Sequence, residues 1–339
     1  MNVTTSTTID TVSETVVASP LYLAYDTDAD FRLSISLTAC VYALLATFGI
    51  IFNTCVCITT VKYRKYYTTL RSNTSILLAV ESLLEIMHQS GHIIFFVKFL
   101  IFGTKFITAK ITSFMMFIPT FGVGGAVCTL FSLSADRLLA IAIPIKYTHF
   151  HQSKYIMKHL IFILIYIVHY TFEMVYSAIS QPNLMVSGGL SDLRSAPPGA
   201  KELNQYLNLA VALGSVFNYL IVGILIKLRT DTSDDRIKKL YRSLSLIVLI
   251  NIGGYLIFYT FIAFTHLPFI QLTPVQYWYC TLVYGLFLNT AAASVGPILY
   301  LNSDEYREAF KRAARDLLKF IFCKTANNST KVIPMTAQR

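Results

Sequence analysis

Seven long apolar segments constrain the fold of this chain more than any other feature of its sequence. A helix that crosses the hydrocarbon core of a bilayer needs about 20 predominantly apolar residues, and each of the seven segments reaches that length. They are residues 34–61, 72–97, 107–141, 156–180, 204–228, 238–264 and 275–301. The sequence therefore predicts an all-α fold, a seven-transmembrane helix bundle, with no separate soluble domain.

Composition supports the same fold class. Only 14% of the residues are charged and 55% are hydrophobic, whereas a soluble domain carries roughly 25% charged residues. A soluble fold would have to hide more apolar surface than this chain can bury. We therefore expect the lipid bilayer to be its solvent.

The basic residues predict how the bundle is oriented. Cytoplasmic loops of membrane proteins carry an excess of Lys and Arg. If the N-terminus is outside, 22 of the 28 Lys and Arg residues flank inner loops or lie in the C-terminal segment. This asymmetry accounts for the net charge of +10 without a nucleic-acid partner. Residues 1–33 are then an extracellular tail, in which Asn2 begins a glycosylation sequon.

A charged pair lies at the inner end of the third apolar segment, and a proline and a tyrosine follow the segment. Asp136 and Arg137 lie at its inner end, with Pro144 and Tyr147 at fixed offsets behind them. Charges at the bilayer edge persist when they pair or serve a function. The seventh segment ends in a Gly-Pro-x-x-Tyr pattern that contains Pro297 and Tyr300. A proline inside a helix removes a hydrogen bond and bends the helix.

These patterns resemble those of rhodopsin-like G-protein-coupled receptors, in the divergent form of the nematode serpentine chemoreceptors (Srsx-like or Srbc-like). The pattern D-R-x-x-A-I-x-x-P-x-x-Y covers residues 136–147, and the segment 303–310 reads Ser-Asp-Glu-Tyr-Arg-Glu-Ala-Phe. The resemblance implies that Arg137 pairs with Asp136 at rest and is released toward a heterotrimeric G protein. It assigns coupling and activation to Asp136, Arg137, Pro144, Tyr147, Pro297 and Tyr300.

One mark of that superfamily is missing. Thr112 stands where most such receptors carry a disulfide cysteine, and the second outer loop, 181–203, has no cysteine. The usual bridge cannot form. The remaining pairing that the sequence leaves open is Cys40 with Cys280.

The second segment carries a stripe of ionisable residues. Glu81, Glu85, His88 and His92 lie at i, i+4, i+7 and i+11 and share one helix face. Such groups usually face a bundle interior or water and mark a function. One interpretation is a polar ligand pocket, with Glu85, His88, His92 and Tyr284 as candidate contacts. The other is structural hydrogen bonding of Glu81 and its neighbours to Asn53 and Asn289 inside the bundle.

The C-terminal segment predicts a membrane-surface helix. Residues 302–322 place apolar side chains on one face and Lys and Arg on the other, as in helices that lie on an anionic leaflet. Cys323 follows, at the start of a cytoplasmic tail over 323–339, and is a candidate for S-palmitoylation. The seven-helix domain itself is expected over 34–301.

The sequence as a whole predicts a chemosensory receptor rather than an enzyme. We expect it to detect a small molecule outside and to activate a G protein inside, with no cofactor and no metal. The expected location is the plasma membrane, including that of a sensory cilium, with several membrane passes. Two alternatives remain: a neuropeptide or hormone receptor of the same superfamily, and a proton-coupled transporter or channel that uses the Glu/His stripe.

Overall fold

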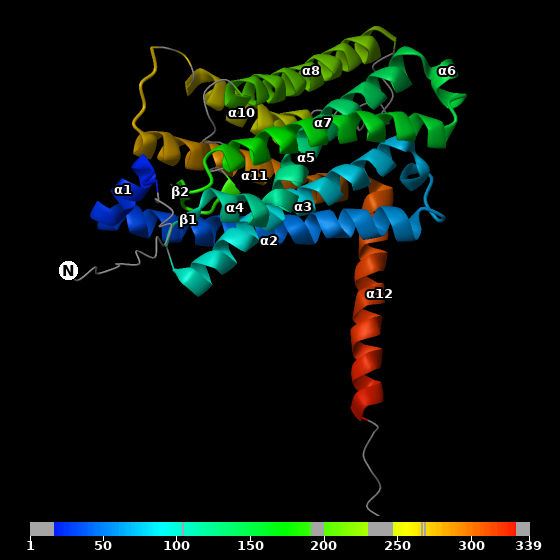
Figure 1. Cartoon of the computed structure of the whole chain (residues 1–339). Helices are drawn as coiled ribbons and strands as arrows, with labels where there is room; N and C mark the ends of the chain where they lie inside the picture. Colours follow the sequence, from blue (N-terminus) through cyan, green and yellow to red (C-terminus); the bar gives the residue numbers. More distant parts are fainter. Residues whose placement is uncertain are drawn as a thin grey trace, which may run out of the picture.

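The molecule is a bundle of long helices that lie side by side, with one further helix at right angles to them (Figure 1). The computed structural model describes residues 17–103, 105–190, 200–229, 247–265, 267 and 269–329. Six of the described helices are long and apolar enough to cross a membrane. They are α2 (Ala29–Tyr63), α3 (Asn73–Phe102), α5 (Phe117–Ala142), α7 (Gln152–Ser180), α8 (Ala200–Arg229) and α11 (Pro274–Asn302).

The sixth segment expected from the sequence is only partly described. Its outer part forms the π-helix η3 (Ile247–Ile252) and the apolar helix α10 (Gly253–Thr265). A π-helix has one residue more per turn than an α-helix and is rare outside functional sites. The expected helix over 238–264 begins outside the described residues.

Local sequence explains where several helices begin. The Asp28 carboxylate accepts hydrogen bonds from the backbone of the first turn of α2, and Ser72 does the same for α3. Thr273 and Gln276 form a reciprocal capping box at α11, with Pro274 in the first helical position. These caps satisfy backbone N–H groups that have no partner within the helix.

The third apolar segment is not one helix, contrary to the sequence-based prediction of a single span over 107–141. It begins as the strand β1 (Ile107–Thr108), continues as α4 (Ala109–Met115), and breaks at Met116 before α5 begins. Strand β1 pairs antiparallel with β2 (Met185–Val186) and so forms a small sheet at the outer end of the bundle.

The N-terminal and C-terminal segments also differ from the sequence-based expectation. The short helix α1 (Pro20–Thr27) and the first residues of α2 lie within the segment expected to be an extracellular tail. At the other end, α12 (Asp304–Ser329) continues beyond the expected end at residue 322. Two shorter helices, η1 (Thr69–Arg71) and α6 (Pro144–Thr148), lie between longer ones.

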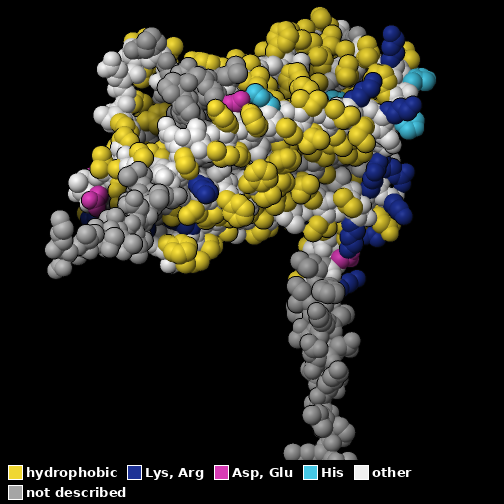
Figure 2. All heavy atoms as spheres, in the orientation of Figure 1, with side chains coloured by type: hydrophobic (Ala, Val, Ile, Leu, Met, Phe, Trp, Pro, Cys, Tyr) yellow, Lys and Arg dark blue, Asp and Glu magenta, His cyan; other side chains and the backbone are white. Residues whose placement is uncertain are grey.

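The core consists of two apolar clusters. The larger one joins α2, α3, α5, α7, α8, α10 and α11 through most of the bundle, and the smaller one lies at the end near α12. Many large apolar side chains face outward, as Figure 2 shows over much of the visible face. On α7 they include Ile161, Leu164, Ile165 and Val168. Such a surface suits contact with lipid acyl chains rather than water.

Candidate functional site

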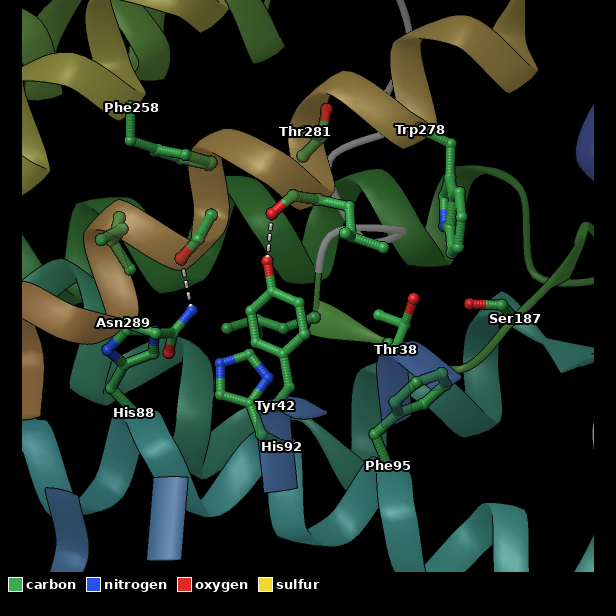
Figure 3. A pocket seen from close by; sticks show the side chains of 15 residues that line it. Thr38, Tyr42, His88, His92, Phe95, Ser187, Phe258, Trp278, Thr281 and Asn289 are labelled. Atoms are coloured by element: carbon green, nitrogen blue, oxygen red, sulfur yellow. Dashed lines mark hydrogen bonds between the residues drawn. The ribbon is translucent and has the colours of Figure 1, made fainter. Parts of the chain in front are cut away.

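A cavity of about 90 Å³ lies near the outer end of the bundle. Residues of α2, α3, α10 and α11 form its walls, and the segment after β2 contributes Ser187, Gly189 and Leu190 (Figure 3). The walls combine aromatic rings with a few polar groups, as small-molecule sites usually do. The lining residues include Tyr42, His88, His92, Phe95, Trp278 and Asn289.

Two of the four candidate ligand contacts line this cavity. His88 and His92 belong to its wall, and the ring of His92 stacks on Tyr42 with a centroid distance of 4.9 Å. The Tyr42 hydroxyl donates to the Leu282 carbonyl at 2.6 Å, so that the stacked pair is fixed to α11. Tyr284 does not line the cavity, because its ring stacks instead on Phe261 at 4.0 Å.

Glu85 lies one step behind the cavity wall. Its Oε2 is 3.0 Å from Nδ1 of His88, and its other oxygen accepts a hydrogen bond from the Tyr255 hydroxyl of α10. One helical turn away, Glu81 accepts a hydrogen bond of 3.0 Å from Asn251 in η3. Both carboxyl groups are fully buried. The stripe therefore links the cavity on α3 to the sixth segment.

Asn53 and Asn289 are buried inside the bundle, but they do not bond to the carboxyl groups of the stripe as expected. Asn53 donates to the Ala292 carbonyl at 2.9 Å, and Asn289 donates to the Gly285 carbonyl at 2.8 Å. The carboxyl groups instead bond to Asn251 and Tyr255. Those two residues lie 170 positions further along the chain, where sequence spacing carries no information about contact.

Among the described residues, no disulfide lies near the outer end of the cavity. The five cysteines whose side chains the structure describes, including Cys40 and Cys280, are free thiols. Thr112, at the position of the missing cysteine, donates its hydroxyl to the Thr108 carbonyl at 3.1 Å. In the described part of the second outer loop, residues 181–190, the β1–β2 pairing, a bridge between Val17 and Leu184, and Lys98 hold the chain in place.

Lys98 is a functional residue that the sequence reasoning missed. It is only 3% exposed, and its ammonium donates to the backbone carbonyls of Ser187, at 2.9 Å, and of Lys105. It thereby ties α3 to the segment before β1 and to the segment after β2, of which the second lines the cavity. A single lysine within the otherwise apolar outer end of α3, residues 93–102, is the signal that could have revealed it.

At the inner end, Asp136 is buried in a cage of hydroxyl groups. Its carboxylate accepts from Thr74 at 2.5 Å, from Tyr147 at 2.8 Å and from Tyr155 at 3.0 Å. These donors come from α3, α6 and α7. Burial, and next the nearby Asp136 carboxylate, raise the pKa of Tyr147 to about 12, so this residue keeps its proton at neutral pH.

The expected ion pair between Asp136 and Arg137 is absent from the described part of the chain. Adjacent residues on a helix point about 100° apart, and the three hydroxyl groups already satisfy the buried carboxylate. Arg137 is partly buried and lies close enough to Tyr147 and Tyr306 to interact with them electrostatically. The sequence also suggests Asp234 and Asp235 as partners for Arg137, but these lie outside the described residues.

The remaining candidate residues lie around the same inner end. Pro144 begins α6, and Pro297 lies inside α11. Tyr300 is partly exposed on the outer surface of the bundle, where its ring lies parallel to Phe310 of α12. Cys323 lies within α12 rather than after it, and its side chain, like Asn2, is outside what the structure describes.

Helix α12 is fixed to the bundle by several polar contacts. Asp316 pairs with Lys62 at 2.9 Å and accepts from the Tyr63 hydroxyl at 2.7 Å. Glu305 accepts from the Thr69 backbone at 2.8 Å. The Lys62 ammonium, and next the Tyr63 hydroxyl, hold the pKa of Asp316 below its usual range. These contacts hold the first part of α12 beside α2, and the rest of the helix projects away from the bundle (Figure 1).

A comparison with protein families matches residues 46–314 to the serpentine type seven-transmembrane GPCR chemoreceptor family Srsx. The matched region includes the buried acids, the Asp136 cage and all of the cavity lining except Thr38 and Tyr42. No curated protein matches the chain.

Proposed function

Because the chain belongs to the Srsx family of serpentine seven-transmembrane GPCR chemoreceptors, we propose that it detects a small molecule in its outer cavity. The bound state then activates a heterotrimeric G protein at the inner face. The family consists of receptors, which confirms the expectation that the chain is not an enzyme. The family and the apolar helices together identify a membrane protein with several passes.

The observation that carries the proposal is the hydrogen-bonded connection behind the cavity wall. His88 lines the cavity and contacts Glu85, and Glu85 accepts from Tyr255 on α10. A ligand shifts a conformational equilibrium only if it interacts differently with the two states. A molecule that bonds to the other ring nitrogen of His88 changes which nitrogen carries the proton, and so changes the Glu85 contact that joins α3 to α10.

The inner face supplies the output of this proposal. Arg137 lies there without an ion pair to Asp136, beside the cage that fixes the end of α5 to α3 and α7. A shift of α10 relative to α3 reaches this region through the packed bundle. Arg137, with Pro144, Tyr147, Pro297 and Tyr300, is the proposed coupling surface.

The cavity size favours a small ligand over a peptide. Its volume is about 90 Å³, whereas drug-sized ligands usually occupy pockets of roughly 300–1,000 Å³. This supports a volatile or small water-soluble compound rather than a neuropeptide or hormone. The proposed location is the plasma membrane, including that of a sensory cilium, with glycosylation of Asn2 outside and palmitoylation of Cys323 inside.

The test is a G-protein activation reporter in cells that express the chain, screened against small volatile and water-soluble compounds. For any compound that activates it, His92→Ala should shift the half-maximal concentration, while Tyr284→Phe, which lies off the cavity wall, should not. A transporter or channel predicts another pattern. In that case Glu81→Gln or Glu85→Gln would abolish a measured proton current, and no compound would activate a G protein.

A further inference from the structure

A second hollow lies at the opposite end of the molecule from the ligand cavity. It is a groove of about 1100 Å³ between the inner ends of α2, α11 and α12. We propose that this groove binds one anionic phospholipid of the inner leaflet. An acyl chain lies along its apolar floor, and the phosphate lies between the lysines at its rim.

The floor of the groove is apolar and open to the side. Residues of α2 and α11 form most of it, with Phe310 and two alanines of α12 at one edge. Ile58 is 50% exposed and Leu301 is 71% exposed. Exposure of this apolar surface to water is unfavourable. An empty groove is also unfavourable, because apolar atoms without neighbours lose their dispersion contacts. A flexible acyl chain supplies those contacts.

The shape of the floor follows from a close helix approach and a kink. A side-chain carbon at Gly296 would lie only 2.9 Å from Cβ of Phe52, so the glycine lets α2 and α11 meet there. Pro297 follows directly and bends α11. Helix α12 then crosses below the contact and closes the inner end of the groove.

The rim of the groove carries a net positive charge. Lys62, Lys311, Lys319 and Asp316 all line it. Asp316 is occupied by Lys62 at 2.9 Å, whereas Lys311 and Lys319 form no ion pair with any residue that the structure describes. Two uncompensated ammonium groups beside an apolar trough complement a phosphate with an attached acyl chain. Figure 2 shows Lys and Arg side chains gathered at this end of the bundle.

The position of the groove favours a lipid over other occupants. It opens to the flank of the bundle at the level of α12, where apolar side chains of α2 and α11 face outward. Basic clusters next to a transmembrane helix attract anionic lipids of the cytoplasmic leaflet. The groove also contains the exposed thiol of Cys55, which supplies a probe of occupancy.

The experiment uses the full chain in phosphatidylcholine nanodiscs with and without phosphatidylserine. Two quantities are measured: the temperature of thermal unfolding, and the rate at which N-ethylmaleimide modifies Cys55, read by peptide mass spectrometry. Phosphatidylserine should raise the unfolding temperature and slow the modification of Cys55 severalfold. The variant K311Q/K319Q keeps the Lys62–Asp316 pair and should lose both effects.

The matched control is K154Q, which removes an exposed inner lysine of α7 outside the groove. It should respond to phosphatidylserine as the unchanged chain does. An equal response in K311Q/K319Q would overturn the proposal, because the lipid would then act through general surface charge. Protection of Cys55 that is independent of phosphatidylserine and is lost in C323S would also overturn it, in favour of an acyl chain on Cys323.

Discussion

The buried carboxylate of Asp136 accepts hydrogen bonds from hydroxyl groups and forms no ion pair with its neighbour in the sequence. A buried charge is costly unless it is hydrogen-bonded, and three hydroxyl groups from three helices meet this need. The sequence placed Asp136 and Tyr147 in one motif but predicted Arg137 as the partner of Asp136. It could not indicate Thr74 or Tyr155, because these reach the site only after α3 and α7 have packed against α5.

Removal of one hydroxyl from this cage should destabilise the protein. A hydrogen bond to a charged group contributes about 1.5–3 kcal/mol, so Tyr147→Phe should lower the free energy of unfolding by about 2 kcal/mol. The raised pKa of Tyr147 adds a pH dependence. A phenol with a raised pKa stabilises the fold fully below its unfolded value of about 10, and loses that contribution as the pH rises toward 12.

The measurement is thermal unfolding in nanodiscs between neutral pH and pH 12. Tyr147→Phe should unfold at a lower temperature at neutral pH and should lose part of the alkaline decline. Tyr176→Phe is the control, because this tyrosine is 56% exposed on the flank of α7. Equal unfolding temperatures of the two variants would show that the hydrogen bond from Tyr147 to Asp136 does not stabilise the fold.

Arg137 should be a signalling residue and not a structural one. It lies at the wet inner edge without an ion pair to its neighbour, where truncating a charge costs little. Arg137→Ala should reach the cell surface in normal amount and lose most G-protein activation in the reporter. Lys110→Ala, on the outer side, should keep its activation. An Arg137→Ala receptor with full activation would remove the proposed coupling role.

At the scale of elements, most helices could be predicted and the outer sheet could not. Apolar runs of sufficient length predict spanning helices, and Asp28, Ser72 and Thr273 cap three of them in the structure. The strands β1 and β2 have two residues each. Segments so short have no periodicity to detect, and their pairing depends on contacts between distant parts of the chain.

The position of the outer β1–β2 sheet should depend on Lys98 rather than on a disulfide. Lys98→Met removes two hydrogen bonds to backbone carbonyls while it keeps the apolar stem. We expect faster modification of a cysteine placed in the cavity wall, for example in Thr281→Cys, once Lys98 is replaced. Lys110→Met serves as the control. Reducing agent should leave the unchanged chain unaffected, and a loss of response in mild reductant would contradict this.

The contact between α3 and α5 should tolerate no added side chain at Gly122. A Cβ atom there would lie 2.3 Å from the backbone nitrogen of His88 and 2.6 Å from the Leu84 carbonyl oxygen. Gly122→Ala should therefore separate the helices and lower both surface expression and unfolding temperature. Gly223→Ala is a matched control, because no atom lies within 4 Å of its added carbon. Equal expression of the two variants would contradict this packing.

At the scale of the whole molecule, charge and hydropathy predicted the class of fold and left its internal contacts open. The family match agrees with a seven-helix receptor. Contacts between elements, such as Glu85 with Tyr255 or Lys98 with Ser187, arise from tertiary packing. One sequence contains no signal for such pairs, so the site could be predicted only to the level of the His88 and His92 stripe.

The basic asymmetry predicts an outside N-terminus and an inside C-terminus. An epitope tag at residue 2 should be labelled on intact cells, and a tag at residue 339 only after permeabilisation. Glycosidase treatment should also increase the mobility of the chain on a gel if Asn2 is modified, and Asn2→Gln should abolish that change. The reverse labelling pattern would exclude the receptor orientation.

The π-helix η3 has a consequence for how this receptor could change by insertion or deletion. It lies directly before α10, which carries Tyr255, and it contains Asn251. A wide turn of this kind shifts the helical phase of the residues that follow it. Deletion of one residue there would restore α-helical winding and rotate Tyr255 by about 100° away from Glu85. The loss of a single codon would therefore change which face of α10 contacts α3, without a change to any residue that lines the cavity.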